Sequence, residues 1–387
     1  MDFGLSKELE MLRKAVREFM TKKVAPNVDE WDANHYLPYK EAIRPMGELG
    51  FFGTVIPEEY GGEDMGWLAA MIVTEEIARI SSSLRVQVNM QVLGCAFTIY
   101  KYGAEETKNK YIEKLCTAEY LGGFGITEPD AGSDVMAMTS TAEDKGDHWL
   151  LNGSKTWISN ANFADAIIYY AYTDQSKGSK GLSAFVVELK NFNGIKTSGL
   201  DKMGSHSSPT GEIFLDNTKV PKENILGKPG DGAKIVFGSL NQTRLSAAAG
   251  AVGLAQACLE ASVKYCNERK QFGKPIGQFQ MNQDMIAQMS TEIEAARMLV
   301  YKAAWAKDQG KLNNGLDVAQ AKYFAGEAAT KCANYAMRIF GAYGYSTEYP
   351  IARYYRDVPT YTMVEGSANI CKWIIALDQL GIRKANR

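Results

Sequence analysis

Apolar residues recur every three to four positions in the first and last thirds of the chain, a spacing that predicts amphipathic helices. After Ser6, a residue type that caps helices, the first such series is Leu12, Val16, Phe19 and Met20. A second series, typical of a helix in a packed bundle, comprises Ile286, Met289, Ile293, Ala296, Val300 and Ala303. Residues 1–120 and 231–387 are therefore predicted to form an N-terminal helical domain and a C-terminal helical bundle.

The middle of the chain, residues 121–230, changes to β-branched and aromatic runs bounded by turn residues, such as AIIYYAYT, GLSAFVVEL and GEIFLDNTKV. Such runs are typical of β-strands. The dipeptide Asn152-Gly153 separates two further runs and predicts a tight hairpin turn. Because no helical pattern separates the strands, we expect an antiparallel sheet. The predicted fold class is α+β, with domains at 1–120, 121–230 and 231–387.

Composition narrows the possible functions. The chain has 387 residues and a formal net charge of −2, which gives no basis for bulk attraction to nucleic acid or an anionic membrane. Its apolar runs are too short to predict a membrane span, and its first residues lack the pattern of a secretion signal. Six cysteines without a CxxC pair indicate buried, reduced thiols in a cytoplasmic protein. Three widely separated histidines predict no metal site.

Several common catalytic motifs are absent from the sequence. It contains no GxxxxGKS or GxxxxGKT loop for phosphates, no GxSxG elbow and no HExxH pair. No GxGxxG follows a predicted strand and opens a helix, so a Rossmann nucleotide site is not supported. A redox cofactor would therefore have to be held in another way.

A single carboxylate, Glu365, stands among apolar and small residues in the stretch TMVEGSA. Burial in such a setting disfavours the charged carboxylate and makes it a stronger proton acceptor, which suits a general base. Gly366 follows it and leaves room for the backbone to approach a ligand. The alternative interpretation is a solvated loop glutamate at the start of a helix.

Five stretches taken together resemble the acyl-CoA dehydrogenase family: GITEPDAGSD (125–134), LNGSKTWISN (151–160), ERKQFGKPIGQFQ (268–280), GAYGYSTEYP (341–350) and RDVPTYTMVEGS (356–367). They occur in the order in which the family has them. The resemblance implies the three-domain fold of the family, with FAD held noncovalently between the β domain and the C-terminal bundle. It also implies a homotetramer built as a dimer of dimers, and it makes Glu365 the base that removes the α-proton of an acyl-CoA.

The resemblance also assigns cofactor contacts. The positions that face the flavin ring are Phe124, Ile126, Thr127, Trp157 and Ser159, and Ser133 lies near the flavin and the CoA chain. The positions that reach the FAD of a neighbouring subunit are Arg269, Gln271, Phe272 and Gln280. Further cofactor-proximal positions are Arg338, Gly341, Ala342, Ser367 and Asn369. The commoner family pattern has Gln at 338 and Gly-Gly at 341–342. Without the resemblance, Trp157 would be interpreted as a core aromatic residue and Arg269 as an exposed helix-end arginine.

Three more residues bear on the substrate. Arg244 matches an arginine that lines the CoA site, with a helix-surface arginine as the alternative. Arg85 precedes Tyr102 by 17 residues, the spacing at which the glutaryl-CoA branch of the family carries the arginine that grips the distal carboxylate. Val364 stands where decarboxylating members of that branch have tyrosine. The non-decarboxylating members from anaerobic bacteria resemble this sequence in having valine there. The resemblance therefore predicts oxidation of glutaryl-CoA to glutaconyl-CoA, with CO2 retained and the electrons passed to an electron-transfer flavoprotein.

Other functions stay open on the sequence alone. Within the family, the alternatives are a decarboxylating glutaryl-CoA dehydrogenase and a dehydrogenase of alicyclic or short-chain acyl-CoA, in which Arg85 would be structural. A different class is a flavin oxidase on the same fold, which passes electrons to O2. A binding-only relative is disfavoured because Glu365 is present and the chain has no basic bias.

Overall fold

The computed structural model describes residues 4–382 and begins with a helical domain. Ser6 caps the first helix, because its Oγ accepts a hydrogen bond from the backbone N–H of Leu9 at 3.3 Å. The predicted stripe faces the core: Val16 and Met20 are fully buried, and Leu12 and Phe19 are half-buried and pack against the same core. The helices of the domain are α1 (Lys7–Phe19), α2 (Val28–Ala33), α3 (Arg44–Glu48), α4 (Trp67–Ile80), α5 (Ser82–Val88), α6 (Phe97–Tyr102) and α7 (Glu105–Cys116). The π-helical segment η4 (Asn89–Ala96) continues directly from α5.

The middle of the chain forms an eight-stranded sheet in the order β6-β7-β3-β2-β4-β5-β8, with β1 paired to β4. The strands are β1 (Gly122–Gly125), β2 (Thr141–Asp144), β3 (His148–Ser159), β4 (Ala166–Tyr172), β5 (Leu182–Glu188), β6 (Ile195–Gly199), β7 (Thr210–Pro221) and β8 (Ile225–Leu226). All seven residues of β4 are buried, because its two faces serve different cores. Ile168 and Tyr170 pack in the core shared with the helices, whereas Ile167 and Tyr169 pack in a second core inside the β domain.

Two details of the predicted sheet are wrong. The sheet is mixed: β1 runs parallel to β4, and Thr141 of β2 meets Tyr172 of β4 in parallel register. The chain passes from β1 through β2 and β3 before it reaches β4, so strands and loops make the crossover and no helix is needed. The predicted hairpin turn at Asn152-Gly153 is also wrong, because both residues lie inside the continuous strand β3.

Gly153 instead marks a shift in the register between β3 and β7. Its φ is +140°, and a Cβ atom there would lie 2.2 Å from Oγ of Ser140. A glycine is thus required by the bulge and by the close approach of Ser140. The real hairpin turn joins β2 to β3, where the N–H of Lys145 donates to the carbonyl of His148 at 3.0 Å.

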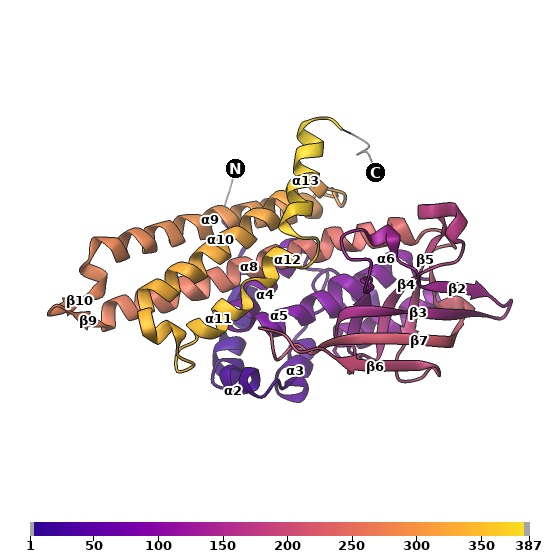
Figure 1. Cartoon of the computed structure of the whole chain (residues 1–387), viewed down its shortest axis with the longest axis horizontal. Helices are drawn as coiled ribbons and strands as arrows, with labels where there is room; N and C mark the ends of the chain where they lie inside the picture. Colours follow the sequence, from indigo (N-terminus) through magenta and orange to yellow (C-terminus); the bar gives the residue numbers. More distant parts are fainter. Residues whose placement is uncertain (1–3, 383–387) are drawn as a thin grey trace.

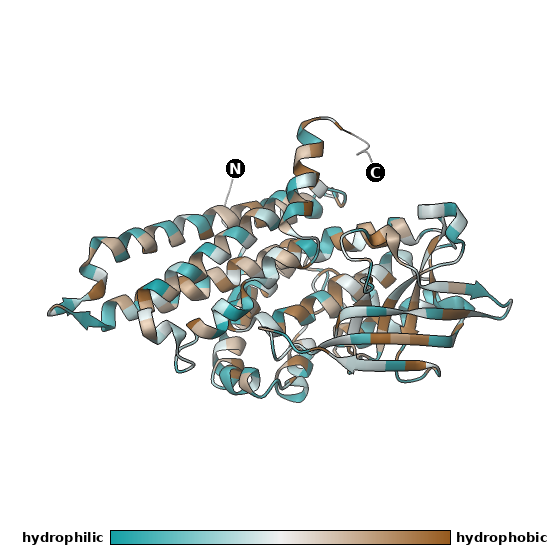
Figure 2. Ribbon diagram, in the orientation of Figure 1, coloured by the Kyte–Doolittle hydropathy of each residue, from teal (hydrophilic) through white to brown (hydrophobic). Residues whose placement is uncertain are grey.

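The C-terminal region is a bundle of long helices (Figure 1). Its elements are α8 (Gly232–Glu268), β9 (Lys270–Gln271), β10 (Lys274–Pro275), α9 (Gln280–Asp308), α10 (Gly315–Phe340), α11 (Ile351–Asp357), α12 (Thr360–Met363) and α13 (Ala368–Gln379). The predicted stripe on α9 is confirmed from Met289 to Ala303, whose five members are buried, while Ile286 is half-buried. Figure 2 shows hydrophilic and hydrophobic residues mixed along the outer helices of this bundle.

Helix α8 is the central element of the bundle. Within residues 4–382 it is the one helix long and apolar enough, by length and composition, to cross a membrane, and 72% of its most apolar window is buried inside the fold. Burial among its neighbours accounts for that composition, as in the core helix of a globular domain. The six cysteines, among them Cys258 on α8, are free and buried, as predicted.

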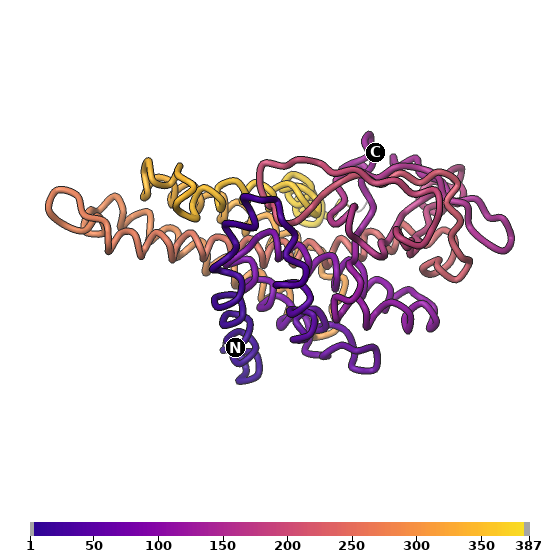
Figure 3. The backbone as a smooth tube through the Cα atoms, turned by 90° about the horizontal axis from the view of Figure 1, so that it is seen from below, coloured from indigo at the N-terminus to yellow at the C-terminus, as the bar shows by residue number. Residues whose placement is uncertain are grey.

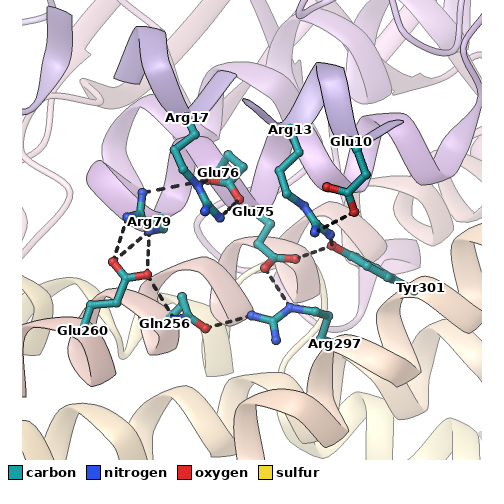
Figure 4. Close-up of polar contacts among 10 residues, drawn as sticks. All are labelled: Glu10, Arg13, Arg17, Glu75, Glu76, Arg79, Gln256, Glu260, Arg297 and Tyr301. Carbon is teal, nitrogen blue, oxygen red and sulfur yellow. Dashed lines mark hydrogen bonds and ion pairs between the residues drawn. The ribbon is translucent and has the colours of Figure 1, made fainter. Parts of the chain in front are cut away.

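Buried acidic residues on α4 connect three helices of the two helical regions (Figure 4). Glu75 accepts hydrogen bonds from Nε of Arg297 and from the hydroxyl of Tyr301, both at 2.9 Å. Glu76 accepts from Arg17 at 2.9 and 2.6 Å. Because each buried carboxylate has a cationic partner, the network fixes α1 and α9 against α4 without leaving an uncompensated charge.

The β domain and the tip of the bundle that carries β9 and β10 lie at opposite ends of the molecule (Figures 1 and 3). The N-terminal helices pack beside the bundle between these ends. The loop between α12 and α13, which contains Glu365, lies on the side of the bundle nearer to the β domain.

Candidate active site

The carboxylate of Glu365 is held by donors from two other elements. Nδ2 of Asn89, the first residue of η4, donates to Oε1 at 3.2 Å, and Oγ1 of Thr243 on α8 donates to Oε2 at 2.5 Å. The glutamate is half-buried. The immediate setting is therefore more polar than the apolar one predicted from TMVEGSA, because two uncharged donors orient the carboxylate without neutralising it.

The backbone around Glu365 adopts an uncommon conformation. Glu365 has φ +57° and Gly366 has φ +84°, so two consecutive residues lie in the left-handed region that favours glycine. Non-glycine residues in this region cluster at functional sites, where the surrounding structure must hold them. Ser367 then caps α13, because its Oγ accepts from the N–H of Ile370 at 3.3 Å.

Arg244 on α8 stabilises this backbone conformation of Glu365 and Gly366. It is 9% exposed, so the alternative of a helix-surface arginine is wrong. Its Nε donates to the carbonyl of Glu365 at 2.8 Å. A Cβ atom on Gly366 would lie 2.8 Å from Nη2 of Arg244, so in this structure the glycine makes room for Arg244.

Arg85 on α5 is a buried cation one helical turn before Asn89. The residue is 2% exposed, and its Cζ lies 5.0 Å from the centroid of the Tyr361 ring. Its Nε is buried without a hydrogen-bond partner. No carboxylate of the described chain lies within 4.0 Å of its guanidinium. Buried charges are normally paired, so this one is suited to an anionic ligand.

Val364 immediately precedes Glu365 and is the C-cap of α12. It is 37% exposed. An aliphatic side chain here offers neither a hydrogen-bond donor nor an acceptor to a ligand that approaches Glu365.

The residues predicted to face the flavin lie on two neighbouring segments of the β domain, β1 with the loop that follows it and the end of β3. Phe124 and Ile126 are buried, on β1 and just after it, while Ser133 is exposed in the loop that follows. Trp157 lies on β3 where the register with β7 shifts. Its φ is +61° and it is 60% exposed, so the alternative of a core aromatic residue is wrong. The remaining members of the group are Thr127 and Ser159, both half-buried.

These residues fit a flavin. An exposed indole on a rigid strand supplies a stacking surface, and the hydroxyls of Thr127 and Ser159 can hydrogen-bond the edge of a polar ring. The strand is fixed beneath them, because the N–H of Thr156 donates to the carbonyl of Thr127 at 2.9 Å. The end of β3 with Trp157 therefore suits an isoalloxazine ring.

A buried ion pair that sequence reasoning missed fixes the loop after β1. Nζ of Lys155 donates to Oε1 of Glu128 at 2.7 Å, and both side chains are buried. Ser140 and Thr139 add hydrogen bonds of 2.6 and 2.8 Å to the same carboxylate. Burial opposes ionisation of Glu128, but Lys155 and these donors outweigh it and lower the pKa of the carboxyl group to about 2.

The other predicted cofactor residues divide into two sets. Ser367 and Asn369 lie directly after Glu365, at the start of α13. The second set lies at the far tip of the bundle and does not meet Glu365 or Trp157 within this chain (Figure 1): Arg269, Gln271, Phe272, Gln280, Arg338, Gly341 and Ala342. All seven are exposed, and Phe272 is 92% exposed at the tip of the β9–β10 hairpin.

Asn89, Thr243 and Tyr361 contact the site, but sequence reasoning did not single them out. A signal existed for Asn89, because it follows Arg85 by four residues and so shares its helix face. Thr243 directly precedes the predicted Arg244. Nothing in the local pattern indicated Tyr361. Among the described residues, no group of three or more His, Cys, Asp or Glu side chains could hold a metal ion.

The fold and site together fit one class of protein: a flavoprotein with a β domain between two helical regions, in which an exposed tryptophan suits the cofactor and a half-buried glutamate and a buried, unpaired arginine suit an anionic acyl substrate. Three family models cover almost the whole chain: the N-terminal, middle and C-terminal domains of acyl-CoA dehydrogenase match residues 6–119, 123–218 and 230–379. The chain belongs to the acyl-CoA dehydrogenase family. It is accordingly an FAD-dependent oxidoreductase.

Individual relatives are also similar over their full length. Glutaryl-CoA dehydrogenase from Desulfococcus multivorans is 78% identical over 389 residues, which cover 100% of both chains. A solved glutaryl-coenzyme A dehydrogenase in complex with glutaryl-CoA matches with a TM-score of 0.98 at 78% identity and covers 100% of this chain and 98% of that one. A chain from a structural study of the electron transferring flavoprotein of Acidaminococcus fermentans matches with a TM-score of 0.96 at 40% identity and covers 99% of this chain and 100% of its own.

Proposed function

We propose that this enzyme oxidises glutaryl-CoA to glutaconyl-CoA without releasing CO2, and that it passes the electrons to an electron-transfer flavoprotein. The observation that carries the proposal is Arg85, a buried guanidinium with no carboxylate partner in residues 4–382. The relative named as a glutaryl-CoA dehydrogenase, at 78% identity, supports the substrate. The similar chain from a study of an electron transferring flavoprotein supports the acceptor.

Arg85 selects the substrate by charge. Its planar guanidinium can form two parallel hydrogen bonds with the distal carboxylate of a dicarboxylic acyl chain. Asn89 follows one turn later on the same face and contacts Glu365. The acyl chain would therefore run from Arg85 to Glu365, which brings Cα and Cβ to the base.

Glu365 acts as the base. Its carboxylate takes the proton from Cα, while Asn89 and Thr243 hold the two oxygens in place. Trp157 and the hydroxyls of Thr127 and Ser159 would hold FAD, which would supply the acceptor for the hydride that leaves Cβ. The C–H electrons at Cα form the new double bond, so the products are glutaconyl-CoA, a protonated Glu365 and a cofactor reduced by two electrons.

Retention of CO2 follows from Arg85 and Val364 together. Decarboxylation would break the bond between Cγ and the distal carboxyl carbon and move that electron pair into a dienolate. A bidentate contact with Arg85 stabilises the charge on the carboxylate and opposes this step. Val364 has no hydroxyl that could compete for either partner.

The assembly we propose is a homotetramer in the cytoplasm. The predicted cofactor residues at the far tip of the bundle cannot serve the site of their own chain, and Phe272 is almost completely exposed. A neighbouring copy that brings this tip to its partner's FAD would use Arg269 and Gln271 and cover Phe272.

The test is anaerobic turnover of the FAD-loaded protein with glutaryl-CoA and an artificial one-electron acceptor, with products identified by mass. We expect glutaconyl-CoA and no crotonyl-CoA. Formation of crotonyl-CoA would support glutaryl-CoA as the substrate but would refute the retention of CO2. Turnover of butyryl-CoA alone would refute the role of Arg85 in selecting the substrate, and substrate-dependent O2 consumption in air would indicate an oxidase.

A further inference from the structure

Lys322 on α10 is a completely buried lysine beside the loop that carries Glu365. It is 1% exposed, and its Nζ donates to the carbonyl of Gly366 at 2.8 Å. Within residues 4–382, no carboxylate lies within ion-pair distance of Nζ. An apolar side chain would fill this position without the unfavourable desolvation of an ammonium group.

The surroundings of Lys322 are rich in charge. Burial lowers the pKa of its ammonium group to about 8, opposed by Cys371 on α13 and by Glu365, and reinforced by Arg244 on α8 and Arg85 on α5. The fold thus keeps a third basic side chain near two arginines, although their mutual repulsion is unfavourable. A hydrogen bond to one backbone carbonyl would not by itself explain this arrangement.

The carbonyl that Lys322 binds is the second of two consecutive carbonyls held by cations. Arg244 binds the carbonyl of Glu365, and Lys322 binds that of Gly366. Glu365 and Gly366, whose carbonyls are held in this way, both have positive φ. The backbone N–H groups of Glu365, Gly366 and Ser367 donate no hydrogen bond within the described chain, so none of these three consecutive donors is committed to an acceptor there. Such a run of N–H groups favours negatively charged or partly charged oxygen atoms.

We propose that Lys322 is a positioning residue for the dehydrogenation: it fixes the Gly366 carbonyl, so that the Glu365 carboxylate and the N–H groups of residues 365–367 face the acyl-CoA. This inference rests on the proposed role of Glu365 as the base. Lys322 also polarises the peptide group between Gly366 and Ser367, which makes the N–H of Ser367 a stronger donor.

The chain contains a matched control for this lysine. Lys307 near the end of α9 is 2% exposed and donates to the backbone carbonyl of Leu312 at 2.9 Å. Burial, reinforced by Lys101, lowers its pKa to about 7. Lys307 thus has the same burial and the same kind of acceptor, but it makes no hydrogen bond to residues 364–367.

The experiment compares Lys322→Met, Lys322→Gln and Lys307→Met in the FAD-loaded enzyme, with glutaryl-CoA and butyryl-CoA as substrates. For Lys322→Met we expect kcat to fall about 10- to 100-fold, the effect of a base displaced by a fraction of an ångström to 1 Å. KM should change less than about threefold, which marks an interaction used in the transition state. The Tm should not fall. Lys322→Gln, which keeps a donor for the Gly366 carbonyl, should restore most of kcat, and Lys307→Met should keep it.

A wild-type kcat in Lys322→Met would overturn the inference. So would an equal loss in Lys307→Met, or a joint fall of kcat and Tm that Lys322→Gln does not repair. The two substrates separate this inference from the proposed function. If the wild-type enzyme oxidises butyryl-CoA but not glutaryl-CoA, the glutaryl assignment fails, and the comparison of Lys322 variants proceeds with butyryl-CoA.

Discussion

The guanidinium of Arg85 lies over the ring of Tyr361, with 5.0 Å between Cζ and the ring centroid. The hydroxyl of Tyr361 in turn donates to Oγ of Ser82 at 3.0 Å, one turn before Arg85 on α5. An aromatic face stabilises a cation without neutralising it. Arg85 is therefore held in place inside the protein while its charge stays without a carboxylate partner in the described chain, as the proposed contact with a substrate carboxylate requires.

Replacement of Arg85 should change substrate preference more than catalytic power. In Arg85→Met, we expect kcat/KM for glutaryl-CoA to fall about 100-fold, since the distal carboxylate would lose charge-assisted hydrogen bonds worth about 1.5 to 3 kcal/mol. The kcat/KM for butyryl-CoA should stay constant or rise, because the position of Arg85 becomes apolar. Steady-state kinetics with both thioesters measure this ratio, and an equal loss for both would assign Arg85 a purely structural role.

Glu365→Gln should nearly abolish turnover, because the amide cannot accept a proton. The expected loss in kcat is about 100- to 10,000-fold, the usual contribution of a general base. The side chains have the same shape, so flavin content, measured by absorbance, should match the wild type. A variant that keeps more than about a tenth of kcat would exclude Glu365 as the base.

Val364→Tyr should allow some decarboxylation. A hydroxyl beside the distal carboxylate can compete with Arg85 for it, which would weaken the contact proposed to retain CO2. Mass analysis should then find crotonyl-CoA beside glutaconyl-CoA. Val364→Phe is the matched control, since it adds the ring without the hydroxyl and should still produce only glutaconyl-CoA. The absence of crotonyl-CoA from an active Val364→Tyr enzyme would refute this account of position 364.

Gly250 on α8 sets the space available to Arg85. A Cβ atom at this position would lie 2.8 Å from Nε of Arg85 and 2.9 Å from Cε1 of Tyr361. Gly250→Ala should therefore displace the guanidinium and raise KM for glutaryl-CoA about tenfold, in keeping with a misplaced binding group. The KM for butyryl-CoA, which has no distal carboxylate, should change less.

Gly238→Ala is the control in the same helix, because a Cβ atom there meets only the Tyr102 hydroxyl, at 3.1 Å. This variant gains helix propensity and should keep the wild-type KM. If the two alanine variants have the same KM for glutaryl-CoA, the space beside Gly250 does not set the position of Arg85.

The ion pair between Glu128 and Lys155 predicts acid sensitivity. The pKa of Glu128 is lowered from 4.5 to about 2 in the folded protein. The unfolded chain therefore binds more protons between these values, and stability from this pair is present above pH 4.5 and is lost as the pH falls toward 2.

Thermal unfolding at a series of pH values measures this effect. Tm of the wild type should fall as the pH is lowered from 4.5 toward 2. The double variant Glu128→Gln with Lys155→Met should lack the part of this fall that comes from the ion pair. The double variant is the appropriate comparison, because Glu128→Gln alone would leave Lys155 buried without its partner. If Tm depends on pH in the same way in both proteins, the acid sensitivity does not come from the Glu128–Lys155 ion pair.

Much of the architecture could be predicted from the sequence, because periodicity is a local property. The stripe from Met289 to Ala303 required only a spacing of three and four residues to predict a buried helix face. The same holds for the β-rich runs that became β4, β5 and β7. The resemblance to the family also predicted Glu365, Arg85 and Trp157 as residues of the site.

Local patterns failed where the conformation depends on a distant neighbour. Asn152-Gly153 predicts a turn, yet Ser140 packs so close to Gly153 that the dipeptide forms a bulge inside β3. The parallel partner of β1 could not be predicted either, since strand pairing across a crossover leaves no local signal.

The sequence by itself determined the order of helices and strands, the family and the residues that carry its motifs. Tertiary structure alone decided what surrounds Glu365. Thr243 is 122 positions away in the chain, Asn89 is 276 positions away, and Lys322 has the appearance of an ordinary helix-surface lysine until α10 is packed against the loop. The physical reason is that hydrogen bonds and buried charges depend on distances in space, whereas sequence patterns record only distances along the chain.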